Sequence, residues 1–245
     1  MKKIVEVKKL KKTYSSKKAV KNISFNIMEN EILGLLGPNG CGKTTTIGML
    51  LGLLKPTSGE ILIDGKKIDE NRIEILERIN FISPYIELPK KLTVKQNLVV
   101  YGKLYKIKNL YQTIDYLTEK LRLENLLQRV TGELSSGQKN RVSLAKALIN
   151  EPYILFLDEP TASLDPEVGD FVRSFLENYK KEKKISILLA SHNMNEVTRL
   201  CKYVLMMKEG EIIDNGSPED LINKHGRKNL EEVFLKLSRS KNEFY

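Results

Sequence analysis

The 245-residue chain contains no tryptophan and only two cysteines, Cys41 and Cys201. Two cysteines cannot form a disulfide framework, and their wide separation matches no common spacing of metal-binding cysteines. These absences exclude the disulfide-rich secreted domains and the cysteine-rich zinc modules. The cysteine content is instead typical of a protein that works in a reducing compartment, which favours the cytoplasm.

Long hydrophobic runs are also lacking. No apolar stretch approaches the roughly 18 residues that a helix needs to span a bilayer. The first residues, Met1-Lys2-Lys3-Ile4, begin a strand-like alternation and carry neither an apolar signal segment nor a small-residue cleavage site. The sequence therefore predicts a protein that is soluble by itself and reaches a membrane only through a partner.

Acidic residues are too few to balance the basic ones, and the formal net charge is +10. The excess comes from lysine clusters such as those within 8–12 and 180–184. Such clusters are typical of solvated faces, and they also suit an anionic membrane surface or, least of all, a specific nucleic acid. Charge alone does not decide among these three, but a hydrophobic content of 41% excludes a disordered chain.

Short apolar segments alternate with helical patterns along the chain. Alternating or continuous apolar residues predict strands at 5–7, 23–27, 31–36, 61–64, 79–82, 153–157, 187–190, 204–207 and 211–214. Helical spacing predicts helices at 43–54, 98–105, 114–121, 135–148 and 196–200, and from 167 and 218 onwards. Pro56 stops the first helix, and Thr93 with Gln96 has the spacing of a capping box. This order predicts an α/β core that carries a helical lobe.

A glycine-rich stretch follows the apolar run at 31–36. Gly37-Pro-Asn-Gly-Cys-Gly-Lys-Thr44 fits the pattern of a phosphate-binding loop, and a helical pattern begins at Lys43. Glycines let successive backbone N–H groups surround phosphates, and the helix N-terminus adds positive potential. Lys43 is expected to contact the β- and γ-phosphates, and the Thr44 hydroxyl to bind Mg²⁺. The chain is therefore predicted to bind Mg·ATP and to hydrolyse it.

A second apolar run, 153–157, ends in a pair of carboxylates, Asp158 and Glu159. In an ordinary protein such a pair can simply mark the end of a strand. Beside a phosphate loop, Asp158 is expected to lie near the magnesium ion, commonly through water. Glu159 is then the better candidate for the general base that polarises the attacking water.

Further motifs resemble the nucleotide-binding cassette of ABC transporters. Leu134-Ser-Ser-Gly-Gln138 is similar to that family's signature motif, with Ser136 where glycine is usual. Ser163-Leu164-Asp165 is similar to the family's D-loop, and Ala190-Ser-His192 to the segment that carries the switch histidine. The motifs occur in the family's order over nearly the whole chain.

The resemblance implies a P-loop NTPase (RecA-like) α/β core with an N-terminal antiparallel β-subdomain and an inserted α-helical subdomain. The implied domain boundaries are 1–226 for the nucleotide-binding domain, about 84–150 for the helical subdomain with the signature motif, and 227–245 for a C-terminal helical tail. The tail stretch Asn229–Leu237 is similar to that of exporter-type cassettes.

The resemblance also implies a site shared between two subunits in a head-to-tail dimer. The implied residues are Tyr14, Val20, Asn39, Gly40, Cys41, Gly42, Lys43, Thr44 and Thr45 for ATP, Thr44 and Asp158 for Mg²⁺, Lys43, Glu159 and His192 for catalysis, Ser135, Gly137 and Gln138 of the second subunit, and Asp165 as a dimer contact. Taken alone, several have plainer interpretations: Tyr14 as a packing residue, His192 as a structural histidine, and Asp165 as a helix cap. For Cys41, a reactive thiol competes with a small residue that merely fits the loop.

One departure from the family concerns the segment after the strand at 79–82. The family places a glutamine there that contacts magnesium and couples the nucleotide to the membrane partner. Here the segment reads Ser83-Pro84-Tyr85-Ile86-Glu87. The magnesium shell would then be completed by water, by Ser83 or by Glu87, and coupling would depend on the shape of residues 84–88.

The leading interpretation is an ATPase subunit that forms a dimer, most simply a homodimer, and drives a separate integral-membrane permease, with export favoured over import. It would lie at the cytoplasmic face of the membrane and need no specific nucleic acid. A soluble ABC ATPase acting on nucleic acid or ribosomes is the first alternative. A regulatory module that binds ATP without turnover is the second.

Overall fold

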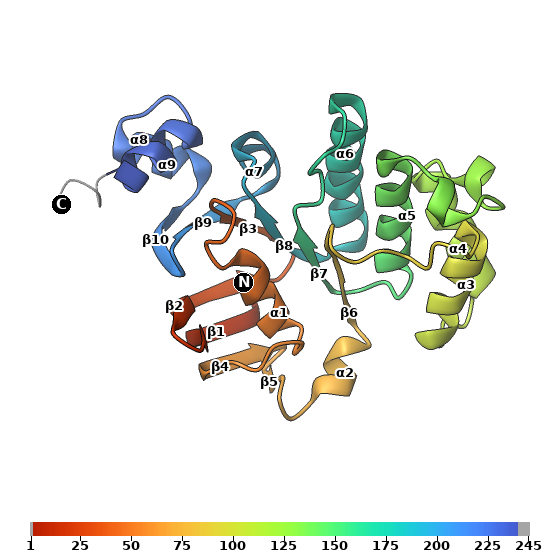
Figure 1. Cartoon of the computed structure of the whole chain (residues 1–245), viewed down its shortest axis with the longest axis horizontal. Helices are drawn as coiled ribbons and strands as arrows, with labels where there is room; N and C mark the ends of the chain where they lie inside the picture. Colours follow the sequence, from red (N-terminus) through yellow and green to blue (C-terminus); the bar gives the residue numbers. More distant parts are fainter. Residues whose placement is uncertain (1, 240–245) are drawn as a thin grey trace. The chain divides into compact units, whose positions relative to one another are not determined.

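The computed structural model describes residues 2–239. The chain divides into two compact units, the first made of Met1–Ile75 with Ser186–Tyr245 and the second of Leu76–Ile185. The helices and strands of each unit carry the labels of Figure 1.

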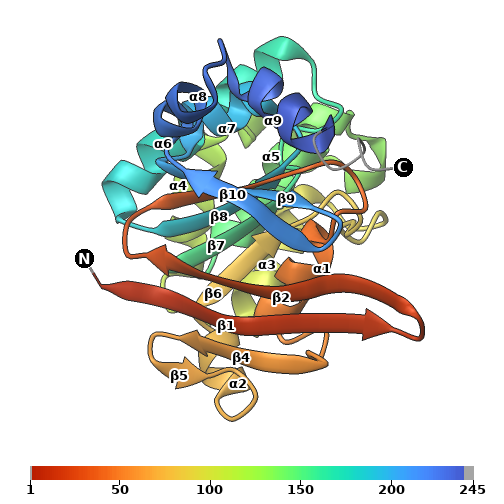
Figure 2. The same ribbon diagram turned by 90° about the vertical axis from the view of Figure 1, so that its left-hand side faces the viewer.

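The N-terminal part of the first unit is an antiparallel sheet. Its strands are β1 (Lys3–Tyr14), β2 (Lys17–Met28), β4 (Ser58–Ile63) and β5 (Lys66–Lys67), in the order β2-β1-β4-β5. Figure 2 shows β1 and β2 as two long neighbouring ribbons, with β4 and β5 beyond β1. Val5 and Val7 are buried while polar residues alternate with them, so one face of the sheet packs and the other meets water. This is the N-terminal antiparallel β-subdomain that the family resemblance implies.

The rest of the first unit is built on strands that are mostly parallel. They are β3 (Ile32–Leu36), β8 (Ser186–Ser191), β9 (Tyr203–Lys208) and β10 (Glu211–Gly216), in the order β10-β9-β3-β8. β3 is parallel to both β8 and β9, and all of its residues are buried. A continuous apolar run is what a strand needs when both of its faces are covered. The carboxyl ends of β3 and β8 lie side by side, because Leu36 pairs with Ser191.

Helices α1 (Lys43–Leu50), α7 (Met194–Leu200), α8 (Pro218–His225) and α9 (Leu230–Arg239) also belong to this unit, and the short α2 (Arg72–Leu76) comes where its first segment ends. The sequence prediction that the first helix continues to residue 54 is wrong. Gly52 adopts a left-handed backbone with φ +63°, and the N–H groups of Leu53 and Leu54 both turn back to the carbonyl oxygen of Gly48. A glycine near the end of a helix favours termination there, so α1 ends before the chain reaches Pro56.

The second unit combines a strand pair with a group of helices. The strands β6 (Ile79–Ile82) and β7 (Ile154–Asp158) are parallel, and the helices are α3 (Val94–Leu104), α4 (Leu110–Lys120), α5 (Ser136–Leu148) and α6 (Pro166–Lys183), with 3-10 turns at Glu124–Leu126 and Thr131–Glu133. Thr93 and Gln96 form the predicted capping box at the start of α3. Figure 1 shows α3, α4 and α5 grouped together. Each of these helices has a buried apolar residue: Leu98, Leu117 and Val142.

A buried lysine joins this helical group to β6. The side chain of Lys146 on α5 is only 9% exposed, and its ammonium lies 5.4 Å from the ring centres of both Phe81 and Tyr101. It donates a hydrogen bond of 3.4 Å to the carbonyl oxygen of Phe81. Removal from water lowers the pKa of Lys146 from 10.5 to about 8, because burial disfavours the charged form.

This lowered pKa makes the stability of the fold depend on pH. Between about pH 8 and 10.5 the unfolded chain binds more protons at Lys146 than the folded chain, so the free energy of unfolding rises with pH there. Relative to Lys146→Met, the unaltered protein should gain up to about 3 kcal/mol across that window. Urea unfolding at a series of pH values measures it, with Lys95→Met on the exposed surface of α3 as control. An identical pH profile for the unaltered chain and Lys146→Met would contradict the assignment.

Candidate nucleotide-binding and catalytic residues

The predicted phosphate loop connects β3 to α1 and is held against the backbone of neighbouring strands. A side chain at Gly37 would overlap the carbonyl oxygen of Met207. Gly42 has φ +112°, and a Cβ there would lie 2.6 Å from the carbonyl oxygen of Ala19. Gly40 has φ +78° but open space around it. The loop is thus fixed on its inner side and open at Gly40, as a backbone cradle for phosphate oxygens requires.

Lys43 and Thr44, the last two residues of the loop pattern, differ sharply in exposure. Lys43 is 5% exposed, and its ammonium donates hydrogen bonds to the carbonyl oxygens of Gly37 at 2.7 Å and Pro38 at 3.3 Å. Thr44 is exposed and Thr45 half-buried, whereas the Thr46 hydroxyl is buried and bonded to the carbonyl oxygen of Gly42. The loop therefore holds a cation inside it and has an exposed threonine, Thr44, at the start of α1. This pair fits the groups that bind a phosphate and its Mg²⁺.

Cys41 and Asn39 lie in the same loop. Asn39 is exposed, whereas Cys41 is 3% exposed, with its backbone N–H bonded to Pro38 and its carbonyl oxygen to Gly210. The burial of Cys41 favours the interpretation that a small residue is needed there over that of a reactive thiol.

The residues predicted to hold the adenine lie on the first β-hairpin. Tyr14 ends β1 with 43% of its surface exposed, and the ammonium of Lys12 lies 4.9 Å from the centre of its ring. Val20 is 1% exposed, and a Cβ built at Gly42 would lie 3.4 Å from its Cγ2. Val20 therefore borders the phosphate loop, and Tyr14 offers an aromatic surface to solvent.

His192 follows β8 and lies beside the phosphate loop. The N–H of Gly37 donates to the carbonyl oxygen of Ser191 at 3.3 Å, and His192 itself is exposed. Sequence reasoning missed the residues that hold this segment. The Ser191 hydroxyl donates to Glu196, which is 1% exposed, at 2.8 Å, and accepts from the N–H of Asn193 at 3.0 Å. The sequence signal, a serine five residues before a glutamate, is too common to be recognised.

In the second unit, β7 carries the predicted carboxylate pair to its end. Asp158 is 1% exposed, and Glu159 follows with φ +52°. A left-handed backbone is uncommon outside glycine, asparagine and aspartate and is often found at functional sites. The chain therefore turns sharply at Glu159, immediately after the strand ends.

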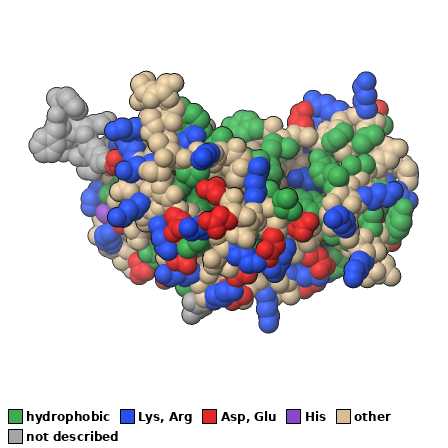
Figure 3. All heavy atoms as spheres, turned by 90° about the horizontal axis from the view of Figure 1, so that it is seen from below, with side chains coloured by type: hydrophobic (Ala, Val, Ile, Leu, Met, Phe, Trp, Pro, Cys, Tyr) green, Lys and Arg blue, Asp and Glu red, His purple; other side chains and the backbone are tan. Residues whose placement is uncertain are grey.

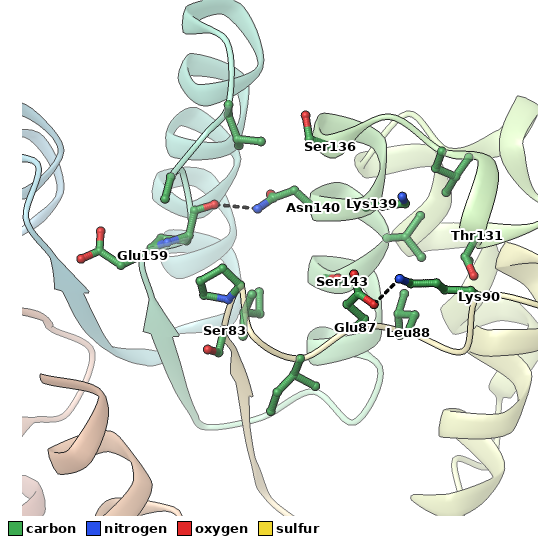
Figure 4. Close-up of a pocket in the computed structure, with 18 residues that line it drawn as sticks. Ser83, Glu87, Leu88, Lys90, Thr131, Ser136, Lys139, Asn140, Ser143 and Glu159 are labelled. Atoms are coloured by element: carbon green, nitrogen blue, oxygen red, sulfur yellow. Dashed lines mark hydrogen bonds and ion pairs between the residues drawn. The ribbon is translucent and has the colours of Figure 1, made fainter. Parts of the chain in front are cut away.

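The segment that lacks the family's glutamine begins at the same edge of this strand pair. Ile82 pairs with Leu157, so Ser83 leaves β6 where Asp158 ends β7. Glu87 instead forms an ion pair of 2.7 Å with Lys90, as Figure 4 shows. The hydrogen bond from Lys90 lowers the pKa of Glu87. Of the two side chains that the sequence left open beside water, Ser83 therefore lies next to Asp158 in the chain's strand order, and Glu87 is paired with Lys90.

The signature stretch forms the start of α5. The Ser135 hydroxyl accepts from the N–H of Gln138 at 3.3 Å, and the Gln138 side chain accepts from the N–H of Ser135 at 3.0 Å. Ser135 and Ser136 are exposed, so the start of α5 has room for a serine in place of the family's glycine. Gly137 is buried, and a Cβ there would lie 3.1 Å from Cγ1 of Val168.

Asp165 caps α6, as its plainer interpretation predicts. Its carboxylate accepts from the N–H of Val168 at 2.9 Å, with Pro166 in the first turn.

Within the part of the chain that the structure describes, no helix has both the length and the apolar character to cross a bilayer.

Several known proteins are similar to the chain over most of its length. A family model described as "ABC transporter" matches residues 20–162. The chain is 38% identical over 231 residues to the bacitracin transport ATP-binding protein BcrA of Bacillus licheniformis, covering 93% of this chain and 74% of that protein. It is 37% identical over 220 residues to the Nod factor export ATP-binding protein I of Paraburkholderia xenovorans, strain LB400, covering 89% and 72%.

Among solved structures, the fold matches a dimeric ATP-binding cassette in a post-hydrolysis state bound to ADP and Pi. The TM-score is 0.80 at 27% identity, over 87% of this chain and 98% of that chain. The predicted α/β P-loop NTPase core is confirmed by this likeness.

Two glycines with the same backbone strain allow a matched test of the loop. Gly40 and Gly65 have φ +78° and +76°, and no atom lies within 4 Å of a Cβ at either. Alanine at each position should cost about 1 kcal/mol of stability, because both backbones are left-handed. Only Gly40→Ala should also weaken nucleotide binding, by about tenfold or more, since its methyl group occupies the open side of the cradle. Titration with a fluorescent ATP analogue measures this, and equal affinities for the two variants would contradict the placement.

Proposed function

The chain belongs to the ABC transporter family, and from that premise we propose that it is the ATP-hydrolysing subunit of a transporter. In this proposal two copies join head-to-tail around two ATP molecules, and the dimer drives a separate integral-membrane permease. The protein lies at the cytoplasmic face of the membrane, held there by the permease.

The phosphate loop is the observation that carries the proposal. Lys43 is buried inside the loop, Thr44 is exposed at the first turn of α1, and His192 stands beside Gly37. A buried cation next to backbone N–H groups and a helix N-terminus is suited to the β- and γ-phosphates of a nucleotide. The solved relative that shares the fold holds ADP and Pi, which supports the same ligand class here.

In this proposal, the remaining site residues have separate roles in ATP hydrolysis. Thr44 and Asp158 supply the hard oxygen ligands that suit Mg²⁺, which when bound neutralises charge on the β- and γ-phosphates. Glu159 accepts a proton from the attacking water, and His192 hydrogen-bonds the γ-phosphate. Tyr14 stacks on the adenine, Val20 packs beside it, and the loop residues Asn39 to Thr45 surround the phosphates.

The second subunit completes each site. The exposed start of α5 offers Ser135 and the N–H groups around Gly137 to the γ-phosphate of the partner's ATP, with Gln138 holding the turn by its capping bond. Asp165, close to this start through the contact of Gly137 with Val168, is proposed as a dimer contact.

Ser83 is proposed to take the place of the missing glutamine. It leaves β6 beside Asp158, whereas Glu87 is held by Lys90 at 2.7 Å. A serine hydroxyl is shorter than a glutamine amide, so it would reach magnesium through a water molecule.

The permease is proposed to dock on exposed apolar residues of the second unit. Tyr85 is 80% exposed and Ile86 47%, and on α3 Val100 is 44% and Leu104 69% exposed. Figure 3 shows hydrophobic side chains gathered over the end of the second unit that carries α3 and α4. Large exposed apolar patches are typical of protein interfaces.

Export is proposed over import. The Nod factor relative is named for export, and the C-terminal stretch that resembles exporter-type cassettes forms α9, with Leu230 and Val233 buried. The proposed domains are 1–226 for the nucleotide-binding domain, 84–150 for its helical subdomain, and 227–245 for the tail, of which 240–245 lie outside the described residues. The alternative of an ATPase that acts on nucleic acid or ribosomes is not favoured by these relatives.

A change at Glu159 separates an ATPase from a module that only binds ATP. Glu159→Gln removes the general base but keeps the size of the side chain, so turnover should fall by about a hundredfold or more while ATP stabilises a dimer. ATPase assays and size-exclusion chromatography with ATP measure both effects, with Glu119→Gln on the exposed face of α4 as control. Undiminished turnover, or a monomer at saturating ATP, would count against the proposal.

Changes in the 83–88 segment test how the permease is coupled. Tyr85→Ala should leave the basal ATPase of the isolated subunit unchanged but lower its stimulation by the permease by about fivefold, as for loss of an interface anchor. Ile73→Ala removes an equally exposed side chain, 78% exposed, from α2 and serves as the control. Coupling through this segment is refuted if Tyr85→Ala combined with Glu87→Gln changes neither transport nor stimulated ATPase.

A further inference from the structure

We propose that Asn140 is a positioning residue that connects the signature stretch of a subunit to the catalytic Glu159 of the same subunit. The inference rests on the proposed function, because it requires a dimer with two shared sites. In such a dimer the signature stretch acts on the partner's ATP, whereas Glu159 acts on the subunit's own ATP. Asn140 would then make hydrolysis at one site depend on how firmly the other site is closed.

The contact itself is direct. The Asn140 side-chain amide donates a hydrogen bond of 2.7 Å to the carbonyl oxygen of Pro160, the residue after Glu159. Figure 4 shows this bond as a dashed line between α5 and the turn that follows β7. It therefore joins a helix that begins with the signature stretch to the backbone that carries the general base.

The turn at Glu159 needs such support. Glu159 has φ +52° and Ser163 φ +62°, so the turn contains two left-handed residues that are not glycine. Such residues persist only where their surroundings hold them, because a left-handed backbone is strained for a residue that has a Cβ. Internal bonds run from the N–H of Ala162 to Glu159 and from that of Leu164 to Thr161. The bond from Asn140 ties this turn to a separate helix.

A cavity lies next to this bond. It has a volume of ≈ 200 Å³ and is lined by residues of the turn, of α5 and of the 82–90 segment, among them Asn140, Glu159, Pro160 and Leu164. Close packing would fix the turn without any hydrogen bond, but a cavity supplies no atoms on that side. The hydrogen bond from Asn140 therefore acts on the turn at a place where close packing contributes little.

The start of α5 is rigid enough to transmit a displacement. Ser135 and Gln138 close the capping box, and Gly137 lies so near Val168 on α6 that a Cβ would sit 3.1 to 3.3 Å from its methyl groups. Asn140 is three residues beyond Gly137, on the next turn of the helix. A shift of the signature stretch on binding ATP would move Asn140 and the turn with it.

The chemistry of Asn140 also fits a role beyond stability. Its side-chain oxygen is buried and has no hydrogen-bond partner among the described residues. A buried oxygen without a hydrogen-bond partner is destabilising, and an apolar residue would avoid that penalty. The amide is therefore explained by what its nitrogen does at Pro160.

Two substitutions remove the donor in different ways. Asn140→Asp keeps the shape but has no N–H, and Asn140→Leu fills the space with an apolar side chain. Both should lower kcat for ATP hydrolysis by the full-length protein by roughly three- to tenfold, the worth of one hydrogen bond, and leave KM unchanged. The Hill coefficient for ATP should fall towards about 1, because the two sites no longer communicate. Asn140→Gln restores the donor and should recover part of kcat.

Ser143→Ala is the matched control. Ser143 lies on the same helix and borders the same cavity but, among the described residues, forms no hydrogen bond to the turn, so kcat and cooperativity should stay at the unaltered values. In a Glu159→Gln background, both Asn140 variants should still form the ATP-bound dimer, because the signature stretch is intact.

The outcomes separate this inference from the proposed function. Unchanged kcat and cooperativity in both Asn140 variants would overturn the inference and leave the ATPase dimer standing. Loss of the fold in both variants would assign Asn140 to stability and would overturn it as well. Failure of Glu159→Gln alone to dimerise with ATP would instead overturn the dimer from which the inference starts.

Discussion

The close approach of backbone to backbone at the phosphate loop is the constraint on which the rest of the first unit depends. Gly37 and Gly42 lie against the carbonyl oxygens of Met207 and Ala19, which belong to β9 and to the edge of β2. The space at these two positions fits the hydrogen atom of a glycine but not a Cβ atom. The loop therefore adopts its folded conformation only when both strands are in position. In that conformation Lys43 points inward.

The fold could be predicted largely from local pattern. Continuous apolar runs identified β3 and β7, because parallel strands covered on both faces need no alternation. The end of α1 differs from the sequence prediction. Pro56 predicts where the helix stops, but Gly52 has already ended it. Helix ends depend on one residue's backbone angle, which periodicity does not report.

The site was predictable only where one stretch of sequence carries the chemistry. The phosphate loop and the pair Asp158 and Glu159 are each contiguous, so their residue types alone indicate what they bind. The bonds of Ser191 to Glu196 and of Asn140 to Pro160 are not visible in this way. Each bond joins a common polar residue to a partner that comes near only in the folded chain. A hydrogen bond from an asparagine to a backbone carbonyl oxygen also requires no particular partner residue, so it produces no recognisable sequence motif.

The hydrogen bonds of Lys43 bear on how nucleotide would be released after ATP hydrolysis. Its ammonium has acceptors of its own, the carbonyl oxygens of Gly37 and Pro38, at 2.7 and 3.3 Å. A buried cation without acceptors would bind phosphate almost irreversibly, because release would leave it uncompensated in a medium of low dielectric. In the proposed role of Lys43, these two carbonyl oxygens compensate the ammonium when phosphate departs, so release of ADP leaves no bare buried charge. Such reversible binding is what repeated rounds of hydrolysis would require, as much as tight binding of ATP.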